Sequence, residues 1–332
     1  IILFQVGPQE KVLEYKPNFN THPWIGLINW IPLFFSYFGF QYYLKGKQRR
    51  ITCCISLICG SIPVLISGYG QYLFGWYGPL QFLNGLIIWY QRENSMGMTS
   101  LFNNQNYASC ALATVYPFLT ASLFTNKKFN IQKIITLILT MLVITGIFFT
   151  TSRNGLLCLI LGTFILLIPL RSKLKLFFIS IFSFSSILLC DFIFKSVFQF
   201  PIIPLKLVQK MQFDNFIYGP RIIIWEKALS YISEKPIFGW GGNSFSSLWN
   251  DGRSEYFGHS HSIPIEIAIQ YGLITSIFLS FIIIYLFFKS FKSIFLNNNK
   301  NIINFNKNNH YDRAWFASSF IIIFSNMIDI LY

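Results

Sequence analysis

Apolar runs of roughly 20 residues recur along most of this chain, and they limit the folds that it can adopt. A run of this length crosses the hydrocarbon core of a bilayer when it forms an α-helix. Backbone groups inside lipid must be satisfied internally, which leaves helices or closed barrels as spanning structures. A barrel requires alternating polar and apolar residues, and the sequence lacks that alternation. We therefore predict an all-α polytopic membrane protein.

The expected membrane helices number about eight and flank one long polar loop. We expect N-terminal membrane helices in residues 1–195, an external catalytic loop with an amphipathic helix in 196–262, and C-terminal membrane helices in 263–332. The loop and the start of the following run hold many ionisable residues, which are costly beside a bilayer and usually mark function. The eight apolar runs are approximately 23–44, 51–69, 107–125, 131–151, 155–170, 174–195, 263–288 and 314–332.

The net charge of +14 comes from basic residues that cluster in short loops between the apolar runs. Cytoplasmic loops are rich in Lys and Arg, which explains this charge without a nucleic-acid partner, and nucleic-acid recognition motifs are missing. If every basic cluster is cytoplasmic, the loops 70–106, 152–154 and 196–262 are external. This parity requires that 70–91 does not span, and its apolar core at 79–90 is too short to cross easily. We expect a re-entrant or interfacial segment there.

The chain begins at Ile1 without a signal peptide, although this topology places its first residues outside. We therefore expect a further helix upstream and interpret the sequence as a fragment. The six cysteines lie in the expected spans without a histidine at metal-ligand spacing, so we interpret them as packing residues.

Arg153 is the first residue in the external loops that we select as a candidate. It lies in a polar break, Thr150–Gly155, between two apolar runs. A snorkelling arginine in a short hairpin is the simpler explanation. However, an external arginine runs against the inside bias for basic residues, and its planar guanidinium suits a phosphate or a carboxylate.

Arg221 is the second candidate and opens an expected amphipathic helix at 222–232. The preceding Pro220 is typical of a helix start. Free backbone N–H groups at a helix start, together with an arginine, favour an anion site, although a solvated arginine on an interfacial helix remains the alternative. The apolar stripe predicted from the spacing comprises Ile222, Trp225, Leu229 and Ile232.

His259 and His261 directly precede a membrane run and allow three interpretations. In an extended segment the two side chains would point to opposite faces, so zinc would need a further ligand from Asp251, Glu255 or Glu266. Alternatively, one histidine acts as a general base near neutral pH, or both are structural.

A lipid diphosphate fits these residues together. Two arginines would hold the leaving diphosphate, and a histidine would deprotonate an attacking hydroxyl. The loop Gly239–Gly242, with Asn243 and Ser244, either supplies further donors or forms an ordinary turn.

Four stretches in a fixed order carry a resemblance to a known family: TTSRNGLL, GPRIIIWEKAL, KPIFGWGGNSF and HSHSIPIEIAIQYGLIT. From about 150 to 275 the chain resembles the O-antigen ligase and O-antigen polymerase superfamily. The most specific element is His-Ser, nine residues, Gly, two residues and Thr, matched here by His261, Ser262, Gly272 and Thr275.

The resemblance implies a GT-C-like fold and a metal-independent, inverting glycosyltransferase without a cofactor. Such enzymes transfer a glycan from undecaprenyl diphosphate to a hydroxyl of a glycan or lipid acceptor, on the periplasmic side of the bacterial inner membrane. Arg153 and Arg221 would bind the diphosphate and His261 would activate the acceptor. Candidate supporting residues are Asn106 in the polar stretch 101–109, Asn243, His259 and Asp329.

A solute transporter is the alternative, because GQYLFGWYGP and LFNNQNYAS also look like cyanobacterial relatives, some of which are labelled bicarbonate transporters. Transporters usually show paired inverted halves, which the sequence lacks, so we favour glycosyl transfer. The sequence leaves open whether the chain is a ligase or a polymerase, and which sugar and acceptor it uses.

Overall fold

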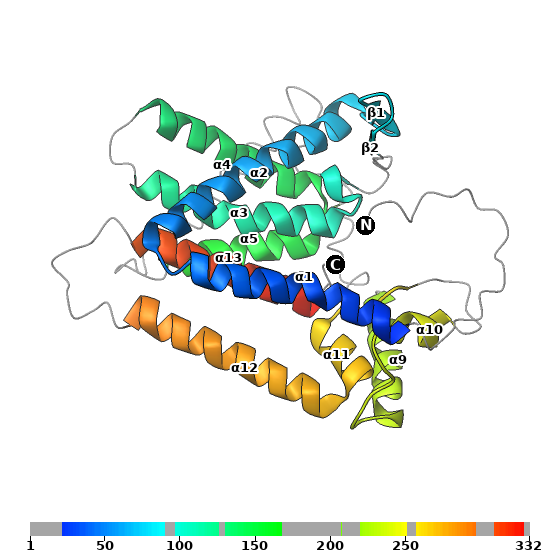
Figure 1. The fold of residues 1–332 in the computed structure, drawn as a ribbon. Helices are drawn as coiled ribbons and strands as arrows, with labels where there is room; N and C mark the ends of the chain where they lie inside the picture. Colours follow the sequence, from blue (N-terminus) through cyan, green and yellow to red (C-terminus); the bar gives the residue numbers. More distant parts are fainter. Residues whose placement is uncertain are drawn as a thin grey trace.

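The computed structural model describes residues 22–89, 97–125, 130–167, 207, 220–250, 257–296 and 309–328. The expected helix at 174–195 and the candidate residue Asp329 lie outside these ranges. Within them the chain is almost entirely helical, and most helices lie roughly along one direction (Figure 1). The helices are α1 (His22–Tyr43), α2 (Lys47–Phe74), α3 (Gln105–Thr125), α4 (Ile131–Phe149), α5 (Arg153–Leu167), α9 (Pro220–Glu234), α10 (Phe245–Asn250), α11 (Ile263–Tyr271), α12 (Leu273–Phe291) and α13 (Asn309–Ile328), with short turns η2 (Ser100–Phe102) and η3 (Lys292–Leu296).

Four of the described helical segments are long and apolar enough to cross a membrane: α2, α3, α4 and Leu273–Leu296, which joins α12 to η3. Helix α5 is apolar but shorter. These segments agree with the predicted polytopic helical membrane protein, whereas the number of eight spans and the GT-C-like arrangement stay predictions.

Helix α3 lies at the centre of the bundle and packs against α4, α5 and α13. Its closest approach to α5 occurs at Gly155, where an added Cβ would overlap Ser109. Small residues at helix crossings let backbones come together, which is the usual way that membrane bundles gain packing energy. The buried core around these crossings includes Leu112, Leu119, Val143, Ile147 and Ile321.

Two hydrogen bonds, one buried and one partly buried, hold α13 in this bundle. Asn154 Nδ2 donates to Ser325 Oγ at 2.8 Å, and Ser318 Oγ donates to the Thr114 carbonyl at 2.9 Å. Polar side chains between membrane helices act as specific ties because lipid offers no competing partner. The helix that begins at Arg153 is therefore fixed against α13 one residue after the arginine.

Helix α12 lies along one edge of the bundle and is largely exposed (Figure 1). In the most apolar 18-residue stretch of its span, only 6% of the residues are buried. It meets α13 near its own C-terminal end, where Phe287 and Phe291 pack against Phe316. Its exposed apolar side chains, which suit contact with lipid, include Ile274, Ile277, Phe278, Phe281 and Ile284.

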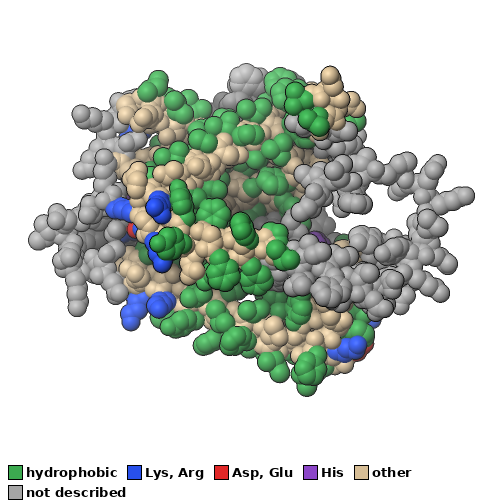
Figure 2. Space-filling model, viewed as in Figure 1, with side chains coloured by type: hydrophobic (Ala, Val, Ile, Leu, Met, Phe, Trp, Pro, Cys, Tyr) green, Lys and Arg blue, Asp and Glu red, His purple; other side chains and the backbone are tan. Residues whose placement is uncertain are grey.

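Most of the Lys and Arg side chains in view gather at one end of the bundle, where α2 and α13 begin and α12 ends, with a smaller group near α9 (Figures 1 and 2). An ion pair joins two of these helices there, with Arg50 Nη2 3.1 Å from Asp312 Oδ1. Helix α5 begins, and α9, α10 and α11 lie, at the opposite end (Figure 1). This separation agrees with the assignment of the basic loops to one side.

The stretch after α2 does not continue as a spanning helix. Helix α2 ends at Phe74, five residues beyond the expected run, and a short antiparallel hairpin follows. Its strands are β1 (Leu80–Phe82) and β2 (Ile87–Trp89), paired with Leu80 opposite Trp89. This agrees with the expectation that 70–91 does not span, while its interfacial position stays a prediction.

The predicted single span at 263–288 is wrong. The chain forms two helices, α11 and α12, which break at Gly272 with φ +87°. An added Cβ at Gly272 would overlap the Ile237 carbonyl oxygen, so the break is where another segment approaches closely. Both helices are apolar overall, so hydropathy alone does not reveal the break.

Candidate functional site

The turn between α4 and α5 places Arg153 at the first residue of α5. Thr151 adopts φ +54°, which reverses the chain, and Ser152 is buried. Ser152 Oγ donates to Asn106 Oδ1 at 2.8 Å and accepts from the Gly155 N–H at 3.2 Å. Asn106 therefore supports the turn that carries Arg153, and its expected role beside the site stays a prediction.

Arg153 and Arg221 interact electrostatically. Partial burial lowers the pKa of the Arg153 guanidinium, and the positive charge of Arg221 lowers it further. Arg153 lies outside the four candidate spans, and Arg221 is the second residue of α9. Both arginines thus begin helices, whose N-terminal N–H groups also favour anions. Two repelling guanidinium groups at helix starts can bind a highly charged anion such as a diphosphate.

Helix α9 begins at Pro220 as expected, but its predicted buried stripe is partly wrong. Ile222 and Leu229 are exposed, whereas Ile224, Ala228 and Ile232 are buried. The buried residues repeat every four positions and pack against α10 and α11. Because Ile222, Ile223 and Ile224 follow one another, the sequence allowed several apolar faces, and only the packing selects one.

The two histidines of the external loop face each other, which corrects the expectation of opposite faces. His261 adopts φ +57°, so the segment is not extended. The ring centroids of His259 and His261 lie 4.4 Å apart, and His259 Nδ1 accepts from the His261 N–H at 3.3 Å. Phe257 lies beside His261, with ring centroids 6.1 Å apart.

Glu266 fixes the backbone just before His261. Its Oε2 accepts from the Ser260 N–H at 2.8 Å, and its Oε1 accepts from Gln270 Nε2 at 2.7 Å. The Ser260 carbonyl in turn accepts from Trp225 Nε1 at 2.9 Å. One residue, Ser260, is thereby held between α11 and α9, the helix that carries Arg221.

The sequence analysis considered Glu266 only as a metal ligand. A single acidic residue in the apolar stretch IPIEIAIQ was the signal that it forms buried hydrogen bonds. The side chain is 4% exposed. Burial raises its pKa above the ordinary value, while the hydrogen bonds and the charge of His261 act in the opposite direction.

The spacing of the motif corresponds to one structural element. The nine residues between Ser262 and Gly272 are α11, which starts after Ser262 and stops at Gly272. Thr275 lies in the first turn of α12, where its Oγ1 donates to the Tyr271 carbonyl at 2.9 Å. The motif therefore describes a short helix that joins the histidine loop to a membrane span.

The Gly239–Gly242 loop is a packing turn, so the expected backbone donors are already engaged. The Trp240 and Gly241 N–H groups donate to the Ile269 and Gln270 carbonyls at 2.8 and 3.0 Å. An added Cβ at Gly239 would overlap those same carbonyls. Asn243 follows with φ +57° at the entry to α10, and its proposed supporting role stays a prediction.

No group of three or more His, Cys, Asp or Glu side chains gathers for a metal within the described ranges. Asp251 and Glu255, the other ligands considered for zinc, lie outside those ranges. Helix α5, which begins at Arg153, starts at the end of the bundle where α9 and α11 lie, and the Trp225 bond links the α9 helix of Arg221 to the loop of His261. Whether all three side chains line one cavity stays a prediction.

Residues 138–280 match the family model described as O-antigen ligase. Over this range, which is less than half of the chain, the sequence is similar to the O-antigen ligase family. The matched range contains the turn before α5, the α9–α11 unit and the whole His-Ser to Thr motif, so the similarity rests on the segments that form this end of the bundle. None of the curated proteins matches the chain. The comparisons give no support to the solute-transporter alternative.

Proposed function

We propose that this protein transfers a glycan from undecaprenyl diphosphate to an acceptor hydroxyl, on the periplasmic face and with inversion. The observation that carries the proposal is the electrostatic interaction between Arg153 and Arg221, together with the Trp225 hydrogen bond that ties the α9 helix of Arg221 to the loop of His261. The two cations belong to separate helices and are near enough for the charge of Arg221 to lower the pKa of Arg153, which supports a shared role in binding a diphosphate leaving group.

The chemistry assigns one task to each charged group. The acceptor oxygen bonds to the anomeric carbon while the bond from that carbon to the diphosphate oxygen breaks. His261 takes the acceptor proton, and Arg153 and Arg221 neutralise the charge that develops on the diphosphate as it leaves on the polyprenyl lipid.

His259 and Glu266 act through His261. His259 packs against its ring, and Glu266 holds the preceding residue. A general base must lie within hydrogen-bond reach of the proton that it removes, so these contacts matter by fixing the position of the imidazole. Both are therefore positioning residues.

The proposal is tested by release of polyprenyl diphosphate from an undecaprenyl-diphosphate glycan, with and without candidate acceptors. We expect acceptor-dependent release, lowered about 10²- to 10⁴-fold by His261→Ala. His310→Ala is the matched control, because His310 stacks on Phe124 at the first turn of α13, where the basic residues gather. Its activity should equal that of the wild type.

Two outcomes would contradict parts of the proposal. Release that His261→Ala leaves unchanged would keep the reaction but remove His261 as the base. No release with any acceptor, together with solute flux into sealed vesicles, would favour the transporter alternative.

A further inference from the structure

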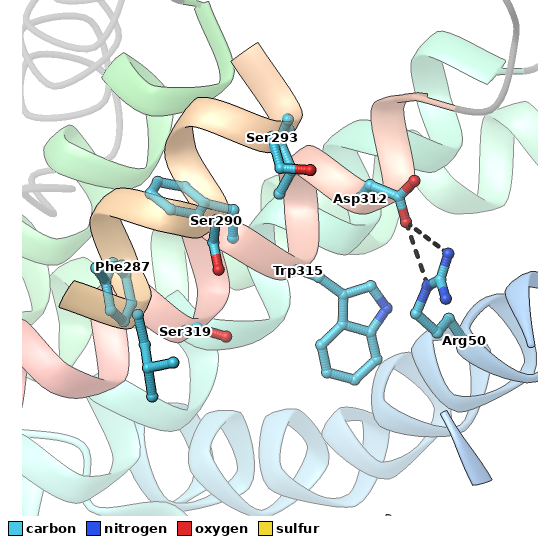
Figure 3. Close-up of a pocket in the computed structure, with 10 residues that line it drawn as sticks. Arg50, Phe287, Ser290, Ser293, Asp312, Trp315 and Ser319 are labelled. Carbon is cyan, nitrogen blue, oxygen red and sulfur yellow. Dashed lines mark hydrogen bonds and ion pairs between the residues drawn. The ribbon is translucent and has the colours of Figure 1, made fainter. Parts of the chain in front are cut away.

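A cavity of about 600 Å³ lies at the basic end of the bundle, and all of its lining residues fall outside the matched family segment (Figure 3). Helices α2, α12 with η3, and α13 enclose it. Its lining residues are Arg50, Leu286, Phe287, Ser290, Ser293, Ile294, Asp312, Trp315, Phe316 and Ser319. Its size falls in the range of small-ligand sites in proteins.

The lining combines hydroxyl groups with apolar side chains. Ser290 and Ser293 come from the end of α12 and from η3, and Ser319 comes from α13 (Figure 3). Phe287 and Trp315 supply aromatic surface. Such a lining fits a molecule with a polar head and an apolar remainder.

The ion pair in the wall is internally satisfied. Arg50 Nε donates to Asp312 Oδ1 at 3.2 Å, and Arg50 Nη1 donates to the Leu44 and Lys45 carbonyls at 3.1 Å each. Arg50 therefore neutralises Asp312 and fixes this wall. The charge that a ligand meets comes from the remaining residues of these helix ends.

That remaining charge is positive. Lys289 and Lys292 directly precede Ser290 and Ser293 in the sequence, and Arg313 lies with its guanidinium 5.9 Å from the Phe295 ring centroid. Lys47 and Arg49 lie in the first turn of α2. Within 47–50, 286–296 and 309–319, Asp312 is the only acidic residue. An anion is therefore favoured at the opening.

The exposed surface of α12 connects this site to lipid. The span is almost unburied, and Ile284, Leu286 and Phe288 are exposed on the turns just before Ser290. Basic pockets between membrane helices on the cytoplasmic side of a protein are typical binding sites for anionic lipid headgroups. The Lys- and Arg-rich end of this bundle is the one expected to be cytoplasmic.

We propose that this cavity binds the headgroup of an anionic glycerophospholipid. The Ser290 and Ser293 hydroxyls donate to the phosphate, Lys289 and Lys292 supply positive charge at the rim, and an acyl chain lies along the apolar surface of α12 beside Phe287. The site is separate from the glycan-transfer site and does not depend on the function proposed for it.

The test measures retention of phosphatidylglycerol and phosphatidylcholine by the purified protein, using native mass spectrometry from mixed micelles. We expect preferential retention of phosphatidylglycerol, reduced about tenfold in Ser290→Val/Ser293→Val because two donors to a charged group are lost. Ser280→Val is the matched control, because Ser280 lies on α12 but does not line the cavity. It should retain the lipid like the wild type.

Equal retention of the two lipids by the wild type would overturn the proposal, and so would an equal loss in the control and in the double variant. Inorganic phosphate is added as a third probe. Displacement of phosphatidylglycerol by millimolar phosphate would identify a free anion as the ligand and overturn the lipid assignment. Unfolding temperatures followed by Trp fluorescence establish that each variant is folded.

Discussion

At the scale of single residues, the buried Glu266 beside the histidine loop should make the stability of the fold depend on pH. Burial raises its pKa, so the folded state holds the proton more tightly than the unfolded state. The contribution of protonated Glu266 to the free energy of unfolding is fully present at low pH. It is lost as pH rises from the ordinary glutamate value of 4.5 through the raised value of the folded protein.

Glu266→Gln should therefore flatten the dependence of stability on pH above 4.5, because the amide cannot ionise while its oxygen still accepts from the Ser260 N–H. The measurement is the unfolding temperature in detergent from pH 4.5 to 8 for both proteins. Glu234→Gln, at the exposed last residue of α9, is the control and should follow the wild type. Parallel curves for Glu266→Gln and the wild type would contradict the prediction.

The arginine pair gives a second prediction at this scale. Lys in place of Arg153 or Arg221 keeps the charge but loses the planar pair of donors, so we expect turnover to fall about tenfold. Gln removes the charge as well and should cost about 10²- to 10³-fold. Steady-state release of polyprenyl diphosphate measures both. Arg49→Lys at the basic end is the control, and equal activity of the Lys and Gln variants would argue against diphosphate binding.

Residue types in this site were more predictable than residue positions. The sequence identified the arginines and histidines as candidates because they interrupt apolar runs. It missed the ring contact of His259 with His261, because that contact requires a positive φ at a non-glycine residue, which no local pattern indicates. The pairing of Arg153 with Arg221 likewise depends on packing between distant helices.

At the scale of elements, the junction between α11 and α12 depends on Gly272. Ala there would combine a strained φ of +87° with an overlap at the Ile237 carbonyl, and we expect a loss of about 1–3 kcal/mol in the free energy of unfolding. Urea or thermal unfolding in detergent measures it. Gly258→Ala is the control, because an added Cβ at Gly258 has no atom within 4 Å, and a similar loss there would refute the argument.

We expect the turn before Gly239 to lie at the lipid–water interface of the membrane. Ile237 and Phe238 are 56% and 86% exposed, and the Pro236 carbonyl accepts from the Leu273 N–H at 2.8 Å, at the start of a candidate span. Exposed aromatic residues beside lysines suit the lipid interface. A spin label at 238 should therefore be relaxed more by oxygen, which concentrates in lipid, than by aqueous nickel. A label at 243 should show the reverse, and nickel dominating at 238 would contradict the prediction.

Helix positions followed largely from hydropathy, since α2, α3, α4 and α5 begin and end close to the expected runs. The interruption at Gly272 and the buried face of α9 did not, because both depend on what packs against them. The apolar residues of α9 lie on several of its faces. Only one face is buried, the one that packs against Phe245 and Ile269.

At the scale of the whole molecule, the basic end and the arginine–histidine end should face opposite sides of the membrane. Cysteine introduced at Asn243 should react with a membrane-impermeant maleimide in intact cells, whereas cysteine at Lys47 should react only after lysis. The native cysteines in the described residues lie within the helices, and the unmodified protein corrects for any labelling of them. Labelling of both positions in intact cells would reverse the topology.

The bond between Leu273 and Pro236 has a mechanical consequence. It attaches the unit that carries Arg221 and His261 to a helix whose tilt adjusts to the thickness of the bilayer, whereas Arg153 belongs to the tightly packed bundle. We therefore expect a thinner or thicker membrane to rotate the α9–α11 unit against the bundle. Membrane thickness would then change the separation of Arg153 and Arg221, and lipid chain length would regulate the proposed glycan transfer without binding at the proposed site.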